Sequence, residues 1–390
     1  MNAPQPLPPV LTAGFRPFFL AASCWAVLAL ALWLAMLMGL VILPSRFDPL
    51  SWHVHEMLFG FVLAGVGGFL LTAIPNWTGR TPVRGALLGV LIGLWALGRA
   101  ATLVSALLPL WLAITADLAF PVLLEVVAAR ELIAAGNRRN YPLMVPVAVL
   151  GLANLLMHLE AAGASVPPGL GWRLGLAAVA MLISVIGGRI VPAFTRNWLT
   201  ARGAARLPPP AGRLDSAALG LLLAGLLAWA CLPDVDGVGW LLLAGAAVHL
   251  VRLARWQGLR TISEPVLAIL HLGYFWLVVA VALLGVARLL PALPLAAALH
   301  ALTAGAFSTM LLAVMTRATL GHTGRALHAD GPTIAIYALV TVGAVLRVLA
   351  AWPAAATMML LGVAALCWAA AFALFAVIYG RFLLTSRPGM

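Results

Sequence analysis

Residues 265–287 read PVLAILHLGYFWLVVAVALLGVA and carry no charged side chain. A helix of about 20 apolar residues is long enough to cross the hydrocarbon core of a bilayer. Runs of this kind recur along the whole chain, separated by short stretches rich in Pro, Gly and Arg. The pattern predicts an all-α integral membrane protein.

The composition of the 390 residues leads to the same class of protein. Hydrophobic residues make up 64% of the chain and charged residues 9%, whereas a soluble protein carries about 25% charged residues. So few charges cannot cover the surface of a soluble domain, and so apolar a chain is not disordered. The long apolar runs also exclude a transmembrane β-barrel, whose strands alternate in polarity.

We predict about twelve transmembrane helices in a single polytopic transmembrane domain, residues 1–390. The longest polar connection, 196–214, divides the helices six and six and is too short to form a domain. The expected spans are 18–43, 54–75, 85–105, 107–129, 142–161, 172–195, 215–233, 237–256, 264–290, 294–318, 332–351 and 354–380.

All 23 basic residues are arginines, and their distribution predicts the topology. With a cytoplasmic N-terminus, 17 arginines, Arg387 among them, fall at inner ends or in inner loops, and 5 fall in the outer half. Cytoplasmic loops carry an excess of basic residues, so both termini are expected in the cytoplasm. The net charge of +12 therefore indicates a lipid membrane as the partner, and no nucleic acid.

The ends of the second, sixth and tenth spans resemble one another. Asn76-Trp77 recurs as Asn197-Trp198, an offset of 121, and Thr78-Gly79-Arg80 recurs as Thr323-Gly324-Arg325, an offset of 245. The offset of 245 also carries His55 onto His300. Three pseudo-symmetric four-helix units would explain these offsets. Chance similarity among apolar helix ends is the alternative.

The densest group of polar residues is Trp52-His53-Val54-His55-Glu56, at the outer end of the second span. On a regular helix, His53 and His55 point in opposed directions and would serve two cofactors, while His53 and Glu56 share a face and would bind one metal. In an irregular first turn, His53 and His55 would form one copper site. Imidazole suits copper and haem iron alike. The alternative is a helix cap that faces water.

Three further histidines are candidate ligands, because ionisable groups in a membrane are costly and usually functional. His300 is followed by small residues that let a bulky group approach, so it is a candidate for holding haem iron. His271 is a candidate axial ligand or inner-side proton group, and His322 is a candidate contact for a metal or a quinone. The alternative for each is a structural histidine, as we expect for the isolated His158 and His249.

Arginines at membrane depth need anionic partners. Arg16 and Arg189, like Arg99 and Arg347, are candidates for binding a haem propionate, because arginine binds carboxylate in a bidentate manner. Asp117, near the middle of the fourth span, is expected to relay protons or to pair with an arginine. The alternative in each case is a structural ion pair. The C-x-x-C-H attachment motif is absent, so any haem is non-covalent, of b type.

The chain resembles the NnrS family of bacterial membrane proteins over nearly its whole length. The resemblance rests on G-F-R-P-F-F (14–19), W-H-V-H-E-M-L-F-G-F (52–61), G-F-L-L-T-A-I-P-N-W-T-G (68–79), G-G-R-I-V-P-A-F-T (187–195), H-L-G-Y-F-W (271–276), H-A-L-T-A-G-A (300–306) and M-T-R-A-T-L-G-H-T-G-R (315–325). It implies twelve spans, haem, copper and a link to nitric oxide and denitrification. The implied ligand candidates are His53, His55, His271, His300 and His322.

A second resemblance, in architecture, is to the catalytic subunits of haem–copper oxidases and nitric oxide reductases. In those subunits an H-x-H pair on one helix serves two haems. Here the pair lies on the second span instead of the tenth, and the sixth and seventh spans contain no histidine. Glu56, Arg189 or an unusual ligand set would have to complete a second metal site.

These observations lead to a haem- and copper-containing protein of the bacterial inner membrane that acts on nitric oxide. As an oxidoreductase it would take electrons from quinol or a periplasmic donor, with His55 and His300 holding haem, and with His53 and a catalytic Glu56 holding a second metal. As a binding protein it would sequester or sense nitric oxide without turnover. The third hypothesis is a secondary transporter with a polar site near the midplane.

Overall fold

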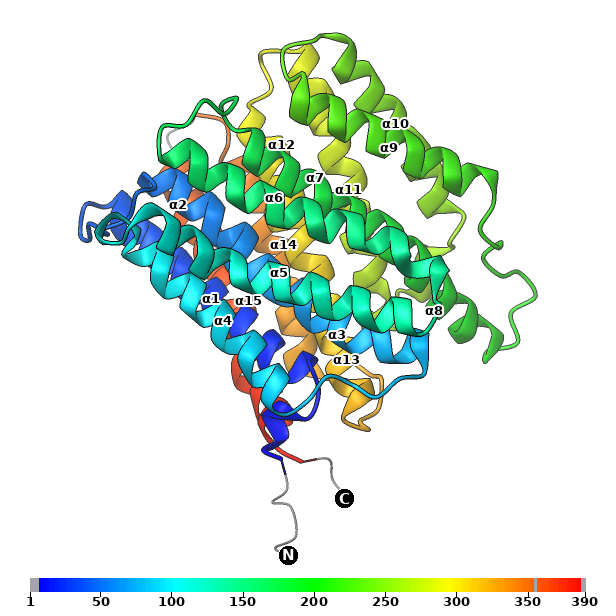
Figure 1. The fold of residues 1–390 in the computed structure, drawn as a ribbon. Coiled ribbons are helices and arrows are strands. Elements are labelled where there is room, and N and C mark those ends of the chain that lie inside the picture. The colour runs from blue at the N-terminus through cyan, green and yellow to red at the C-terminus, as the bar shows by residue number, and fades with distance from the viewer. Residues whose placement is uncertain (1–6, 354–355, 387–390) are drawn as a thin grey trace, which may run out of the picture. The chain divides into compact units, whose positions relative to one another are not determined.

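The computed structural model describes residues 7–353 and 356–386. Over these residues the chain is helical, with no strand, and twelve helices are long and apolar enough to cross a membrane (Figure 1). They run Phe15–Leu37, Pro49–Thr78, Ala86–Leu103, Leu110–Ala134, Arg138–Ala161, Leu170–Thr200, Arg213–Cys231, Gly237–Ala254, Pro265–Leu289, Leu295–His322, Gly331–Leu349 and Thr357–Leu384. The prediction of an all-α protein with twelve spans is confirmed. Arg387 and the first two residues of the expected span 354–380 lie outside the described residues.

The spans are assembled from fifteen α-helices among the described residues. These are α1 (Phe15–Leu37), α2 (Pro49–His55), α3 (Leu63–Thr78), α4 (Ala86–Leu103), α5 (Leu110–Ala134), α6 (Met144–Ala161), α7 (Leu170–Leu182), α8 (Gly188–Thr200), α9 (Arg213–Cys231), α10 (Gly237–Ala254), α11 (Pro265–Leu289), α12 (Leu295–His300), α13 (Ser308–His322), α14 (Gly331–Leu349) and α15 (Thr357–Leu384). Short 3-10 turns lie at Pro9–Leu11, Ser105–Leu107, Arg138–Leu143 and Gly258–Thr261.

The second, sixth and tenth spans are each interrupted by a π-helical segment. The segments are η2 (Glu56–Val62), η5 (Ile183–Gly187) and η7 (Ala301–Phe307). In η2 the backbone N–H of Leu63 donates to the carbonyl of Leu58, five residues earlier. Such wide turns are rare and frequently mark functional sites.

The π segments relate the second span to the tenth. Segments η2 and η7 begin at residues 56 and 301, which are 245 positions apart, and each is seven residues long. Gly79 and Gly324, also 245 apart, both take a left-handed backbone with φ of 69° and 73°. The offset of 245 therefore relates the backbone structures of the second and tenth spans as well as their sequences. In the sixth span η5 does not keep the offset of 121, so the three-unit repeat stays a prediction.

Wide π turns free backbone carbonyls, and side chains bind them in each segment. Trp95 Nε1 donates to the Gly60 carbonyl at 2.9 Å, and Arg252 Nη1 donates to the Ser184 carbonyl at 3.1 Å. The Ser308 hydroxyl donates to the Thr303 carbonyl at 2.9 Å. Because an unpaired polar group in lipid costs several kcal/mol, about 2–7 depending on the reference state, these bonds make the π turns tolerable at membrane depth.

The chain divides into two compact units. The first comprises residues 1–175, 318–325 and 372–390, and contains α1 to α6. In it α4 packs along α5, α5 along α6, and α1 along α3. The second comprises residues 176–317 and 326–371, where α11 packs against α10 and η7 and α9 packs against α10. The single domain 1–390 stays a prediction.

Candidate metal centre

Three helices of the first unit bring together a buried histidine pair and a carboxylate. His55 ends α2, Asp117 lies in α5 and His158 lies near the end of α6. Their exposed fractions are 0%, 1% and 2%. Asp48 caps the start of α2, accepting from the backbone N–H groups of Leu50 and Ser51, so the short helix that carries His55 has a fixed beginning.

The ligand atoms of the three side chains converge on one carboxylate oxygen. Asp117 Oδ2 lies 3.1 Å from His55 Nε2 and 3.0 Å from His158 Nε2. These three side chains could hold a metal ion. Within the described part of the chain, one ligand atom from each lies within 4.8 Å of the other two. Two donors in a tetrahedral zinc-like site lie about 3.3 Å apart, so the spacing fits an ion.

Glu56 holds the other side of the His55 ring. Its Oε1 lies 3.1 Å from His55 Nδ1, and the Thr102 hydroxyl donates to the same oxygen at 2.8 Å. Trp25 Nε1 donates to Oε2 at 2.8 Å. A carboxylate that accepts from one ring nitrogen fixes the orientation of the ring, as is common around metal-bound histidines, while Nε2 here faces Asp117.

Arg99 joins the two carboxylates. Its Nη1 donates to both oxygens of Glu56, each at 2.8 Å, and its Nη2 donates to Asp117 Oδ1. All three side chains are at most 4% exposed. The two carboxylates and the one guanidinium leave a net charge of −1 on this buried group, before the histidines are counted.

Acceptor atoms face both nitrogens of the His55 ring. Nδ1 faces Glu56, and Nε2 faces Asp117 and the Asn154 Oδ1 atom, the latter at 3.1 Å. The Asn154 amide nitrogen is buried without a hydrogen-bond partner among the described residues. Acceptor oxygens thus face both ring nitrogens, so the site stabilises one positive charge there, either a second proton on the His55 ring or a bound cation.

Aromatic rings close the centre off. The rings of Phe47 and Phe59 lie 4.7 and 5.0 Å from the His55 ring, and Phe47 lies 5.1 Å from the ring of His158. Both phenylalanines are buried. The His55 ring is therefore enclosed by two phenylalanine rings together with its polar partners. Haem at His55 stays a prediction.

The structure does not place His53 and Glu56 in the metal-ligating group. The His53 ring is stacked on Trp33, with centroids 4.1 Å apart. Both Glu56 oxygens already accept from Arg99 and its neighbours. A metal shared by His53 and Glu56, a metal shared by His53 and His55, and a catalytic Glu56 all stay predictions.

In the second unit, His271 is buried on α11. Its Nε2 lies 2.8 Å from the Thr195 hydroxyl, which itself donates to the Val191 carbonyl, so Nε2 carries the proton. The Nδ1 atom is buried without a hydrogen-bond partner among the described residues and lies against Gly258, where an added Cβ would come within 2.6 Å. Its role as an axial ligand or proton group stays a prediction.

His300, half-buried at the end of α12, has the protonation that a metal ligand needs. Its Nδ1 lies 2.7 Å from the Ala296 carbonyl. A carbonyl only accepts, so Nδ1 carries the proton and Nε2 keeps its lone pair. Arg347, half-buried on α14, interacts electrostatically with His300. His300 and His55 belong to different units, so a haem held between them stays a prediction.

The remaining predicted residues have other surroundings. Arg16 is buried, and its Nη1 donates to the carbonyls of the C-terminal residues Phe382, Leu383 and Thr385. Arg189 lies half-buried in α8. His322 is exposed, with its ring 5.5 Å from that of Phe15. Binding of a haem propionate by Arg16 or Arg189, and of a metal by His322, stay predictions.

His158 and His249, which sequence reasoning treats alike, differ in the structure. The His249 ring is satisfied by the Ala218 carbonyl at 3.0 Å and the Tyr274 hydroxyl at 2.8 Å, as expected for a structural histidine. His158 instead faces Asp117, so its reading as an isolated residue is wrong. The pairing of Asp117 with Arg99 was one of the two expected outcomes. The sequence feature that could have revealed this pair is a histidine and an aspartate in neighbouring spans.

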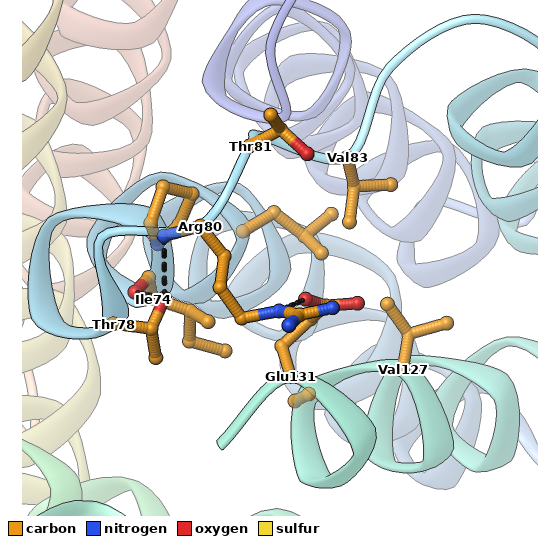
Figure 2. Close-up of a pocket in the computed structure, with 10 residues that line it drawn as sticks. Ile74, Thr78, Arg80, Thr81, Val83, Val127 and Glu131 are labelled. Carbon is orange, nitrogen blue, oxygen red and sulfur yellow. Dashed lines mark hydrogen bonds and ion pairs between the residues drawn. The ribbon is translucent and has the colours of Figure 1, made fainter. Parts of the chain in front are cut away.

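A small pocket lies at the other end of the second span, where the motif Thr78-Gly79-Arg80 leaves the helix (Figure 2). Apolar side chains line it, with Arg80 reaching across to Glu131. The Glu131 carboxylate is bound by both Arg80 and Arg130. The motif therefore closes a helix end with an ion pair, and we assign the pocket no chemistry.

Fold and site define a polytopic helical membrane protein with a buried candidate metal centre. A family comparison narrows this class: the model of the family described as NnrS protein matches residues 9–387. The chain therefore belongs to the NnrS family, as the sequence motifs predict. No curated protein matches the chain.

Proposed function

We propose that this protein binds a metal ion in the bacterial inner (cytoplasmic) membrane and acts on nitric oxide. The observation that supports the proposal is the buried group of His55, Asp117 and His158 in a twelve-span chain of the NnrS family. The link to nitric oxide comes from the family resemblance alone.

Copper is the ion that we propose for this centre, because the family resemblance implies copper and imidazole nitrogens can bind it. When bound, it would supply a binding site for nitric oxide and exchange one electron at a time. His55, His158 and Asp117 would hold the ion. Glu56 would act as a positioning residue, since it fixes the orientation of His55 through Nδ1 and itself is held by Arg99.

Haem b, held non-covalently, is the second cofactor of the proposal. His300 is its proposed ligand, because Nε2 keeps its lone pair and Arg347 supplies a cation for a propionate. We favour His300 over His55 because acceptor atoms and aromatic rings already surround His55. His271 is the candidate for a second axial position.

Reduction would follow 2 NO + quinol → N2O + H2O + quinone. Quinol, as electron donor, supplies both electrons and both protons, so atoms and charge balance. The alternative within the proposal is binding of nitric oxide without turnover, for sequestration or sensing. A secondary transporter is the third hypothesis, and the buried ion pairs around Asp117 do not favour it.

The test is a visible spectrum and a metal analysis of the detergent-purified protein, oxidised, reduced and treated with nitric oxide. We expect copper that is lost in His55→Ala and retained in His300→Ala. We expect haem bands that shift with nitric oxide and are lost in His300→Ala alone. Consumption of nitric oxide with reduced quinol would separate turnover from binding. A colourless protein without metal would overturn the proposal and favour a transporter.

A further inference from the structure

Two loops of the second unit form a surface with one sign of charge. Residues 201–213, from the end of α8 to the start of α9, and residues 255–263, between α10 and α11, contain five arginines and no acidic residue. The loops touch, because Arg260 Nη1 donates to the Arg206 carbonyl at 2.9 Å. Both side chains are exposed, and neither belongs to an ion pair of the described residues. The surface therefore lacks anionic partners within the described chain.

Hydrogen bonds hold the two loops in a defined shape. Gln257 takes a left-handed backbone with φ of 60°, which among the described residues no other non-glycine residue adopts. Such strained positions recur at functional sites. The Gln257 Oε1 atom accepts from Arg260 Nη1 at 2.9 Å, and in the facing loop the Pro208 carbonyl accepts from Arg196 Nη2 at 2.5 Å. The position of Arg260 is thus fixed by its neighbours.

One edge of the Arg260 guanidinium is left for a ligand. Both of its hydrogen bonds use Nη1, and no hydrogen bond among the described residues uses Nε or Nη2. Those two nitrogens present parallel N–H groups, the geometry in which arginine binds two oxygens of a phosphate or carboxylate. A lysine could not offer this fork. The edge therefore fits a phosphate oxygen pair.

Apolar side chains stand on both sides of Arg260. Leu259 is 86% exposed and Ile262 is 67% exposed. Neither lies in a span, since the neighbouring spans end at Ala254 and begin at Pro265. At the end of membrane helices, apolar side chains beside a basic one suit the boundary where lipid headgroups meet acyl chains. A soluble anion would leave both side chains in water.

We propose that this surface is a binding site for an anionic phospholipid. Arg206 and Arg260 hold its phosphate, and Leu259 and Ile262 contact its glycerol and the adjoining acyl carbons. The excess of arginines predicts that both loops lie in the cytoplasm, where the inner leaflet supplies such lipids. A zwitterionic lipid carries the same phosphate, but its own cation opposes the arginines. The inference uses neither a metal nor nitric oxide, so it is independent of the proposed function.

The experiment titrates the detergent-purified full chain with phosphatidylglycerol and, separately, with phosphatidylcholine, and counts bound lipids by native mass spectrometry. We expect the first phosphatidylglycerol to bind at least about tenfold more tightly than phosphatidylcholine, and Arg206→Gln/Arg260→Gln to abolish most of this preference. The matched control is Arg138→Gln/Arg139→Gln, which removes two exposed arginines from the turn between α5 and α6. It should keep the preference.

Leu259→Ser/Ile262→Ser tests the apolar part and should also weaken phosphatidylglycerol binding, while inorganic phosphate should not displace the lipid. Equal loss of preference in the two double arginine variants would show attraction by net charge alone and overturn the inference. Displacement by inorganic phosphate would overturn it too, because the surface would then be a site for free anions. Melting temperatures identify any variant that fails to fold. The wild type remains decisive in that case, since equal affinity for the two lipids contradicts the site.

Discussion

At the scale of single residues, the contacts of each histidine separate those that can bind an ion from those that cannot. His158 Nε2 faces Asp117 Oδ2, and His55 Nε2 faces the same oxygen. His249 faces a carbonyl and a hydroxyl that use both of its nitrogens. The rings of His158 and His249 are both buried, so burial does not distinguish them. Their hydrogen-bond partners do.

His158→Ala and His249→Ala are therefore a matched pair. We expect His158→Ala to reduce the bound copper at least tenfold, because a donor is lost, and His249→Ala to keep it. Both should lower thermal stability, since each breaks a buried hydrogen bond worth about 1 kcal/mol or more. Elemental analysis and thermal unfolding of both proteins check this. Equal loss of copper in the two variants would contradict the assignment.

At the scale of the element, short capped helices and π segments set the direction of the functional side chains. The helix α2 has only seven residues and ends at His55, where η2 begins. Glu56 Oε1 reaches the His55 ring at 3.1 Å at the start of η2, although adjacent helical residues point about 100° apart. Asp48 fixes the beginning of the same helix.

Asp48→Ala is expected to destabilise the protein by about 1 kcal/mol at neutral pH, because the cap bonds to Leu50 and Ser51 are lost. Burial alone would raise the pKa of Asp48, but the hydrogen bonds from Ser51 and Leu50 outweigh it and lower the pKa. The stabilisation is thus complete above the ordinary aspartate pKa and is lost as pH falls through the lowered one. Unfolding of wild type, Asp48→Ala and the control Asp48→Asn across this range tests it.

Gly188→Ala probes the π segment of the sixth span. An added Cβ would lie 2.1 Å from Arg252 Nη2 and would displace the guanidinium that binds the Ser184 carbonyl. We expect a loss of about 1–3 kcal/mol in stability. Gly89→Ala in α4 is the control, because no atom lies within 4 Å of its Cβ, and it should be neutral or stabilising. Similar melting temperatures for the two variants would show that the contact is unimportant.

At the scale of the whole molecule, the alternation of polar loops with twelve apolar helices fixes how the chain crosses the membrane. Arginines are in excess in every second loop, counted from the loop that follows the second span. This excess predicts that both termini and the loop 201–212 lie in the cytoplasm. The loop 162–169 is then periplasmic, on the same side as His55 and His158.

Reporter fusions test this topology. Alkaline phosphatase joined after the loop 162–169 is expected to be active, and phosphatase joined after the loop 201–212 inactive. A green fluorescent protein reporter should give the reverse pattern, because it fluoresces in the cytoplasm. Phosphatase activity at the 201–212 loop would contradict the predicted orientation and would place the metal centre on the cytoplasmic side.

The class of protein, the twelve spans and the family could be predicted from the amino-acid sequence alone. These follow from apolar runs, from arginines at their ends and from motifs that are contiguous in the chain, so local information suffices. The importance of His55 and Glu56 was also visible, since they are adjacent. Their individual roles were not, because a role depends on what faces each atom.

Which residues make up the candidate centre depends on how the helices pack in three dimensions. Asp117 and His158 belong to different helices, 41 residues apart, and His55 and Asn154 are 99 apart. No spacing in the sequence relates such positions; Asp117 and His158 meet because α5 packs along α6. Long-range helix packing, which has no local sequence signature, brings separate polar residues into one buried group.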